Sequence, residues 1–114
     1  MTDCIFCKMI AGEIKPDTVY EDDDVLAFRD INPQAPIHVL VVPKEHIPTI
    51  NDLDMNHAAL VGKLYLAAKQ IARQEGMSER GYRTVMNCNA EAGQTVFHLH
   101  LHVLGGRSMR WPPG

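Results

Sequence analysis

The sequence lacks the features of several common classes of protein. No apolar run approaches the roughly 20 residues that cross a membrane. The formal net charge is -3, and no basic stripe is present to neutralise a nucleic-acid backbone. The first ten residues, MTDCIFCKMI, are too short and too charged for a signal peptide. We therefore expect a cytoplasmic protein that binds neither a membrane nor a nucleic acid.

Cysteine is scarce, with 3 residues in 114. An odd count in a reducing compartment argues against a disulfide framework. Cys4 and Cys7 form a C-x2-C pair, and Cys88 stands alone as a small residue that we expect to be buried. The chain has no repeats, linkers or low-complexity tracts. Its length predicts a single domain, residues 1–114, with one hydrophobic core.

The hydrophobic pattern predicts an α+β fold with an antiparallel sheet of about five strands. A short N-terminal helix is expected over residues 5–11, and one long helix is expected to cover a face of the sheet. The expected strands are 18–22, 25–30, 37–43, 82–87 and 95–104, separated by acidic, proline-rich or Asn/Gly-rich loops.

The long helix has clear start and stop signals. Asp54 is the expected N-cap, and Gly76 is placed to end the helix. Its apolar positions recur at helical spacing and are Leu60, Val61, Leu64, Ala67, Ala68, Ile71 and Ala72. His57, in the first turn, is interpreted as an ordinary surface residue.

Three histidines alternate with apolar residues in the stretch VFHLHLHVLGG, residues 96–106. On a strand, His98, His100 and His102 share one face and lie about 6.6–6.8 Å apart in succession. Leu99, Leu101 and Val103 then point to the opposite face, toward the helix. Two interpretations compete for the histidine face: a metal site and a catalytic site.

The loop before the histidines favours catalysis at phosphorus. Three metal ligands from one strand form an awkward geometry, whereas an imidazole nitrogen is a good nucleophile toward phosphorus. The loop AGQT, residues 92–95, places a glycine just upstream. Backbone N–H groups beside Gly93 can approach an anion closely because glycine has no Cβ.

The stretch HLHLHVL resembles the His-φ-His-φ-His-φ-φ signature of the histidine triad superfamily of nucleotide hydrolases and transferases. IFCKMIAGEI, YEDDDVLAFRDINPQAPIHVLVVPKEHI, GQTVFHLHLHVLGG and the WPPG tail are similar to its nucleotide-binding branch. The resemblance implies a homodimer with one continuous sheet and binding of purine nucleoside monophosphates. It also implies hydrolysis of the P–N bond of nucleoside 5′-phosphoramidates, and of aminoacyl-adenylates.

The resemblance assigns roles to individual residues. His100 would attack the α-phosphorus and carry a nucleotidyl-histidine intermediate, while His102 would contact the phosphate and help protonate the departing amine. The carbonyl of His98 or its side chain, together with His38, would orient His100, although His38 also fits a satisfied core histidine. The expected nucleotide contacts are Asp30 on the ribose; Asn87, Gly93, Gln94 and Thr95 on the phosphate and ribose side; Ile5, Phe6, Phe28, Ile31 and Leu40 around the purine; and Trp111, reaching the partner subunit's site. Thr95 keeps the hydroxyl of the serine that is common at its position.

The C-x2-C pair resembles that of bacterial members that hold a structural zinc. Cys4, Cys7, His46 of the PKEHI stretch and His98 would then be the four ligands. A Cys2His2 set has no open position, so this zinc would not be a catalytic cofactor. The alternative is a pair of half-buried cysteines without a metal.

Two other functions stay open at this point. One is a dinucleoside polyphosphate hydrolase or nucleotidyl transferase of the same superfamily, against which the WPPG tail and the GGR after the triad argue. The other is a nucleotide-binding scaffold protein whose hydrolysis is incidental. The sequence names neither the physiological substrate nor a preference between adenosine and guanosine.

Overall fold

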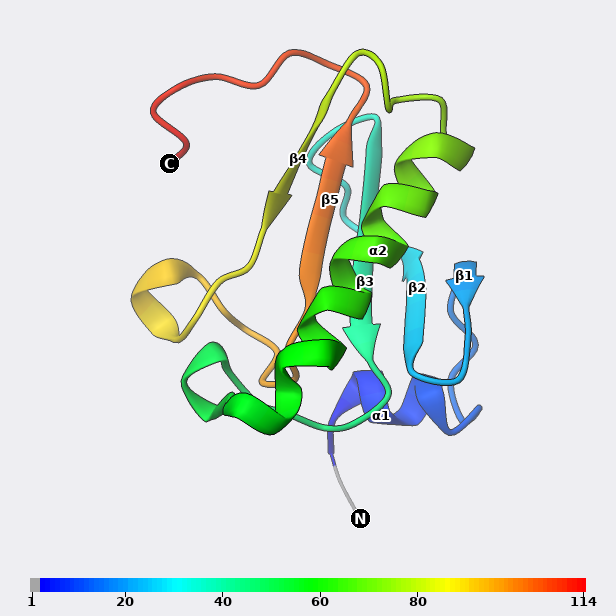
Figure 1. The fold of residues 1–114 in the computed structure, drawn as a ribbon, viewed down its shortest axis with the longest axis vertical. Helices are drawn as coiled ribbons and strands as arrows, with labels where there is room; N and C mark the ends of the chain where they lie inside the picture. The colour runs from blue at the N-terminus through cyan, green and yellow to red at the C-terminus, as the bar shows by residue number, and fades with distance from the viewer. Residues whose placement is uncertain (1–2) are drawn as a thin grey trace.

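The computed structural model describes residues 3–114, which form a single antiparallel sheet with one long helix across it (Figure 1). The helices are α1 (Ile5–Ile10) and α2 (Ala58–Gln74), and three single 3-10 turns are η1 (Ile50–Asp52), η2 (Met55–His57) and η3 (Ala90–Ala92). The strands are β1 (Thr18–Glu21), β2 (Val25–Arg29), β3 (Ile37–Pro43), β4 (Tyr82–Val85) and β5 (Leu101–Gly105). The predicted α+β fold is confirmed.

The strand order in the sheet is β1-β2-β3-β5-β4, and every neighbouring pair is antiparallel. The last strand, β5, is therefore inserted between β3 and β4. Its register places His102 opposite Leu40 and places Leu104 opposite His38. This pairing brings the histidine of the central strand beside the histidine triad.

The two faces of the sheet have different coverings. On one face, alternate residues of β2, β3 and β5 pack against the buried side of α2, which crosses this face in Figure 1. On the other face, Phe6 of α1 packs on Leu26, Phe28, Leu40 and Val42. The short helix covers only part of this second face, and the histidines lie beside it.

The start of the long helix differs from the prediction. Asp54 caps the 3-10 turn η2, because its carboxylate accepts the N–H of Asn56 and the ring of His57 accepts the N–H of Asp54. This closed pair of hydrogen bonds uses one separate turn, and α2 begins only at Ala58. His57 is thus a half-buried capping residue rather than an ordinary surface residue. Gly76 follows the helix with a φ of +76°, as its role as a stop signal requires.

The last strand is shorter than the predicted 95–104. The register that pairs Leu101 with Val41 would pair Leu99 with Pro43, which has no backbone N–H to donate. The N–H of Leu99 instead donates to the carbonyl of Ile47 at 2.7 Å. The alternation nevertheless continues through the irregular residues, since Leu99, Leu101 and Val103 are all buried in the core beneath α2.

The fourth predicted strand and the lone cysteine also differ from the prediction. The strand expected over 82–87 ends at Val85. Cys88 is half-buried and has a free thiol, so the expectation of a buried residue was wrong. Among residues 3–114, no helix is both long and apolar enough to span a membrane.

Replacing Leu64 by alanine is expected to lower the free energy of unfolding by about 2–5 kcal/mol, because this side chain is fully buried between α2 and the sheet. Leu66→Ala is the matched control on the same helix. Leu66 is 65% exposed, and its truncation should change the free energy by less than about 0.5 kcal/mol. Denaturant unfolding of both variants measures the difference, and equal losses would contradict this placement of the core.

Candidate active site and metal centre

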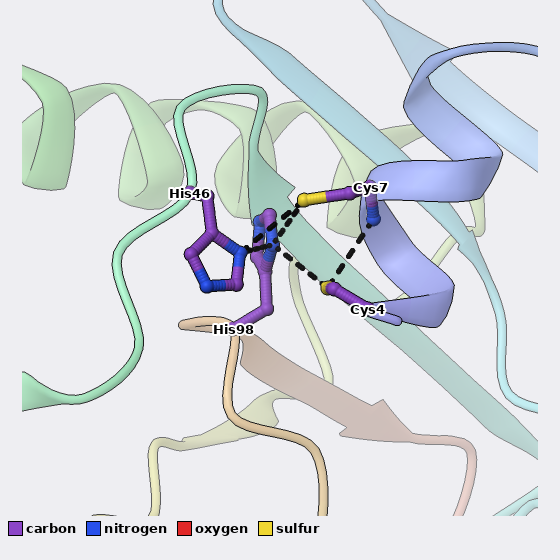
Figure 2. Close-up of side chains that lie close together, drawn as sticks. All are labelled: Cys4, Cys7, His46 and His98. Carbon is purple, nitrogen blue, oxygen red and sulfur yellow. Dashed lines mark hydrogen bonds between the residues drawn. The ribbon is translucent and has the colours of Figure 1, made fainter. Parts of the chain in front are cut away.

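Two cysteines and two histidines converge where α1 meets the sheet (Figure 2). Cys4 is the N-cap of α1, and its sulfur accepts the N–H of Cys7, so the C-x2-C spacing turns both thiols to the same side. His46 comes from the loop after β3, and His98 lies just before β5. Figure 2 shows both thiols pointing toward the two imidazole rings.

The distances in this cluster fit a tetrahedral metal ion. The Sγ atom of Cys4 lies 3.3 Å from Nδ1 of His98, and Sγ of Cys7 lies 3.2 Å from Nδ1 of His46. The two Nδ1 atoms are 3.1 Å apart, and all four ligand atoms lie within 4.8 Å of one another. Zinc bonds of about 2.0–2.3 Å in a tetrahedron require ligand separations of about 3.3–3.8 Å. The four residues therefore fit a Cys2His2 zinc site.

The protonation of the cluster also suits a cation. Nε2 of His98 lies 2.8 Å from the carbonyl of Pro43, which can only accept, so this nitrogen holds the proton and Nδ1 presents a lone pair to the thiols. Burial lowers the pKa of His98 and keeps the ring neutral. Burial, and then the neighbouring Cys4, raise the pKa of Cys7 to about 11. A bound cation would offset the cost of ionising this thiol.

The middle histidine of the triad has a free nitrogen available for attack. Nδ1 of His100 lies 2.7 Å from the carbonyl oxygen of His98, a contact that the resemblance implied, so Nδ1–H donates and, in the neutral ring, Nε2 carries the lone pair. The ring packs edge-on against Phe6 at a centroid distance of 5.2 Å. A neutral imidazole held by one backbone bond, with its other nitrogen unprotonated, is the form that acts as a nucleophile.

The third histidine of the triad pairs with the histidine of β3. Nε2 of His38 lies 2.9 Å from Nδ1 of His102, and the backbone N–H of Gln34 donates to Nδ1 of His38 at 3.0 Å. A backbone N–H can only donate, so His38 is protonated at Nε2 and donates to His102. His102 in turn is protonated at Nε2. The expectation that His38 orients His100 was wrong, since the ring that it contacts is His102.

Both rings of this pair favour the neutral state. Burial, followed by the rings of His100 and His38, lowers the pKa of His102 to about 4. Burial also lowers the pKa of His38, against the opposing effect of Asp30, whose carboxylate lies 3.5 Å from Nε2. Near pH 7 the pair therefore carries no charge, and its protons serve as hydrogen-bond donors.

The structure groups only some of the expected nucleotide contacts. Phe6, Phe28 and Leu40 form a buried apolar surface beside His100, with the two phenyl rings 5.4 Å apart. Asp30 is half-buried near His38. Ile31 is 99% exposed, and Ile5 is also exposed. Trp111 is exposed at the far edge of the sheet, against the guanidinium of Arg83 on β4.

The loop before the triad is organised by Gln94. Its side chain is buried, accepts the N–H of Asn89 and donates to the carbonyls of Pro48 and Val96. These bonds occupy the amide, and the backbone N–H of Gln94 donates to the carbonyl of Asn89 at 3.1 Å, so the residue shapes the loop and offers no donor to a phosphate. Around it, Gly93 and Thr95 are exposed and Asn87 is half-buried, with Gly93 at a φ of +93°.

Some important groups of the site gave no signal in the sequence. The carbonyl of Pro43 and the N–H of Gln34 are backbone atoms, which every residue type supplies. Their roles depend on where the chain folds, so no residue pattern predicts them. Arg107 was also missed, and its guanidinium reaches the carbonyl of Gln34.

The sequence model of the HIT domain family matches residues 11–109 of this chain. The chain belongs to the HIT family. Its fold is that of a HIT family hydrolase from Legionella pneumophila, with a TM-score of 0.96, 54% identity, and coverage of 98% of this chain and 100% of that one. The purine nucleoside phosphoramidase of Escherichia coli is 51% identical over 105 residues, which are 92% of this chain and 88% of that protein. A HIT-like protein of Synechococcus elongatus is 57% identical over 98% of this chain and 97% of its own length.

The matched part of the HIT domain contains His38, His46 and the whole triad. Cys4 and Cys7 precede it and Trp111 follows it. The thiol half of the metal centre therefore lies outside the matched domain, while both imidazole ligands lie inside it. The candidate metal site thus lies between the N-terminal helix α1 and the matched domain.

We expect the purified HIT domain to contain about one zinc ion per chain, because four suitable ligands are already placed at tetrahedral separations. Cys7→Ser should lose the ion and lower the melting temperature by several degrees. Cys88→Ser is the control, since this thiol lies outside the cluster. Elemental analysis of protein prepared without chelator measures the content. A zinc content far below one ion per chain would contradict the assignment.

The free energy of unfolding should fall as the pH is lowered from about 6.5 toward 4. In this window the unfolded chain takes up a proton at His102 and at His38 that the folded chain, with lowered pKa values at both, does not. The contribution is fully present above pH 6.5. Urea unfolding at several pH values measures it, and His102→Asn should reduce the slope. An unchanged slope in the variant would contradict the neutral state of this ring.

Proposed function

We propose that this HIT domain is a purine nucleoside phosphoramidase that hydrolyses the P–N bond of nucleoside 5′-monophosphoramidates. The observation that carries the proposal is the unprotonated Nε2 of His100, held by the bond from Nδ1–H to the carbonyl of His98. The identity of 51% to a purine nucleoside phosphoramidase supports it. Aminoacyl-adenylates, which present the same α-phosphorus with a different leaving group, are a second proposed substrate class.

In the first step, Nε2 of His100 attacks the α-phosphorus and forms a P–N bond to the ring, while the bond to the leaving amine breaks. The departing nitrogen is strongly basic and takes the Nε2 proton of His102. The Nε2–H of His38 points at Nδ1 of His102 and stabilises the negative charge that develops on that ring. The products of this step are the free amine and a nucleotidyl-histidine.

In the second step, a water molecule gives one proton back to Nε2 of His102, and its oxygen attacks the phosphorus. The bond to His100 breaks, the ring recovers its lone pair, and the nucleoside monophosphate is released. After the second step, His102 again holds its Nε2 proton and His100 its lone pair, so the enzyme is back in its starting state. The covalent intermediate divides one difficult displacement into two easier ones.

The nucleotide would lie against the second face of the sheet. The buried surface of Phe6, Phe28 and Leu40 is apolar and suits the flat faces of a purine, with Ile5 and Ile31 at its rim. Asp30 is close enough to the histidine pair to accept the ribose hydroxyls. The exposed turn at Gly93, with Thr95 and Asn87, is left for the phosphate and ribose side.

The proposed assembly is a homodimer of single-domain chains in the cytoplasm. Strand β4 is at the edge of the sheet and leaves a row of backbone groups unpaired within the chain. Such an edge can continue into the same strand of a second copy. Trp111 packs on Arg83 of β4, so pairing at this edge would bring the tryptophan near the partner subunit.

The proposed zinc has a structural role. Cys4, Cys7, His46 and His98 would hold it, and with four protein ligands it supplies a cross-link and no open position for substrate. The cross-link would fix α1, and thereby Phe6, against the sheet. It would also fix His98, whose carbonyl holds the nucleophile.

Replacing His100 by alanine should lower hydrolysis of an adenosine 5′-phosphoramidate by at least about 10³-fold, since the attacking nitrogen is removed. His57→Ala is the control, because this ring caps η2 and lies outside the site. Rapid acid-free quenching followed by mass spectrometry should find a nucleotidyl adduct on wild-type protein alone.

The same assay separates the other functions. Hydrolysis of a diadenosine polyphosphate faster than of the phosphoramidate would favour the polyphosphate hydrolase. Retention of phosphoramidase activity by His100→Ala would refute the mechanism. Loss of activity with every cellular role retained would favour the scaffold.

A further inference from the structure

A single backbone N–H decides which way the His38–His102 pair donates. Nδ1 of His38 faces the N–H of Gln34 at 3.0 Å, so a proton on that nitrogen would meet another proton. The ring is left with Nε2–H, 2.9 Å from Nδ1 of His102. His102 then has only Nε2 on which to hold its own proton. The tautomers of two buried rings thus follow from the position of one peptide group.

The segment that carries this N–H is clamped by the residues after β5. The guanidinium of Arg107 donates to the carbonyl of Gln34 at 2.9 Å and to the carbonyl of Ser108 at 3.1 Å. Beside it, Gly106 lies so close to Pro36 that an added Cβ would be 2.9 Å from the proline Cβ. Both contacts join the residues just after β5, the strand that bears His102, to the loop whose Gln34 N–H faces His38.

The loop between β2 and β3 is also braced from within. Asp30 accepts the N–H of Asn32 at 2.8 Å, and the side-chain amide of Gln34 donates to the carbonyl of Asn32 at 3.0 Å. These bonds fix the shape of the loop, and Arg107 fixes its position against β5. Together they hold the Gln34 N–H at the ring of His38.

The same N–H argues against a metal ion at this pair. Asp30, His38 and His102 offer ligand atoms within 4.8 Å of one another, which resembles a metal site. A metal bound at Nε2 of His38 would need a lone pair there while Nδ1 also accepts from Gln34. That arrangement requires an imidazole stripped of both protons. The cluster is therefore a chain of hydrogen bonds.

We propose that Gln34, through its backbone N–H, and Arg107, through the Gln34 carbonyl, are positioning residues that hold His38 as the Nε2–H tautomer and His102 as a donor through Nε2. The catalytic consequence rests on the proposed function, in which this proton goes to the leaving nitrogen. The tautomeric consequence does not rest on it and is measurable in the free protein.

The test uses nitrogen NMR of the imidazole rings in the zinc-loaded protein near neutral pH, which distinguishes the two neutral tautomers. In the wild type, His38 and His102 should each show the Nε2–H form alone. Gln34→Pro removes the N–H, whereas Gln34→Ala keeps it and loses only the side-chain bond to Asn32, so the proline variant should show much the larger mixture at both rings. Arg107→Ala keeps the Gln34 N–H but removes the bond that holds its peptide group in position, so a smaller fraction of the Nδ1–H tautomer should appear at both rings.

Kinetics on an adenosine phosphoramidate give the second readout. Gln34→Pro should lower kcat by about tenfold with KM within about twofold, a part of the roughly 10²–10⁴ that positioned proton transfer contributes. Arg107→Ala should lower kcat by about threefold, in keeping with one surface hydrogen bond. Gln34→Ala keeps the N–H and loses only the exposed side-chain bond to Asn32, so its kcat should fall less than that of Gln34→Pro. Arg80→Ala should match the wild type, because Arg80 is exposed and has no hydrogen bond or ion pair among residues 3–114.

The outcomes separate the two proposals. The positioning role is supported if the wild type shows single Nε2–H tautomers and Gln34→Pro and Arg107→Ala show mixtures. This holds even if no phosphoramidate is hydrolysed, because that result would refute only the proposed function. Unchanged tautomers in both variants would overturn the positioning role, and Arg107→Ala decides alone if the proline variant fails to fold. Added zinc that shifts the His38 nitrogens after the cysteine site is filled would also overturn it.

Discussion

His98 is the residue on which both sites of this molecule depend. Its Nε2–H is bound by the carbonyl of Pro43, its Nδ1 faces the two thiols and His46, and its carbonyl accepts the Nδ1–H of His100. The ring is fully buried, so each of these groups needs its partner. A change at the metal centre that turned this ring would also displace the carbonyl that holds the nucleophile.

The three triad histidines are equivalent in sequence and different in chemistry because their backbone partners differ. His98 and His102 are protonated at Nε2, and His100 is protonated at Nδ1. In the neutral rings, one lone pair faces the thiols, a second lies at Nε2 of His100, whose ring packs on Phe6, and a third accepts from His38. One sequence pattern thus supplies the proposed metal ligand, the proposed nucleophile and a hydrogen-bond donor.

Residue types predicted the parts of the structure that side chains determine. β3 has the bounds expected from its β-branched run, and the C-x2-C pair does meet the two histidines. The failures concern backbone geometry. β5 begins late because its partner position is Pro43, and the amide of Gln94 is used within its own loop. The partner of His38 depended on strand register, which the alternation of apolar residues alone does not specify.

The two faces of the sheet depend on different contacts for their stability. One face is sealed by α2 over an apolar core and needs no help from the histidines. The other face has only α1, a helix of 6 residues that is too short to be stable by itself. The proposed metal cross-link at the first turn of this helix would therefore support the face that has the shorter covering helix. The same cross-link would hold Phe6, which packs on His98 and on His100. The same contacts thus stabilise the second face and orient the proposed nucleophile, so a change in these contacts would affect both.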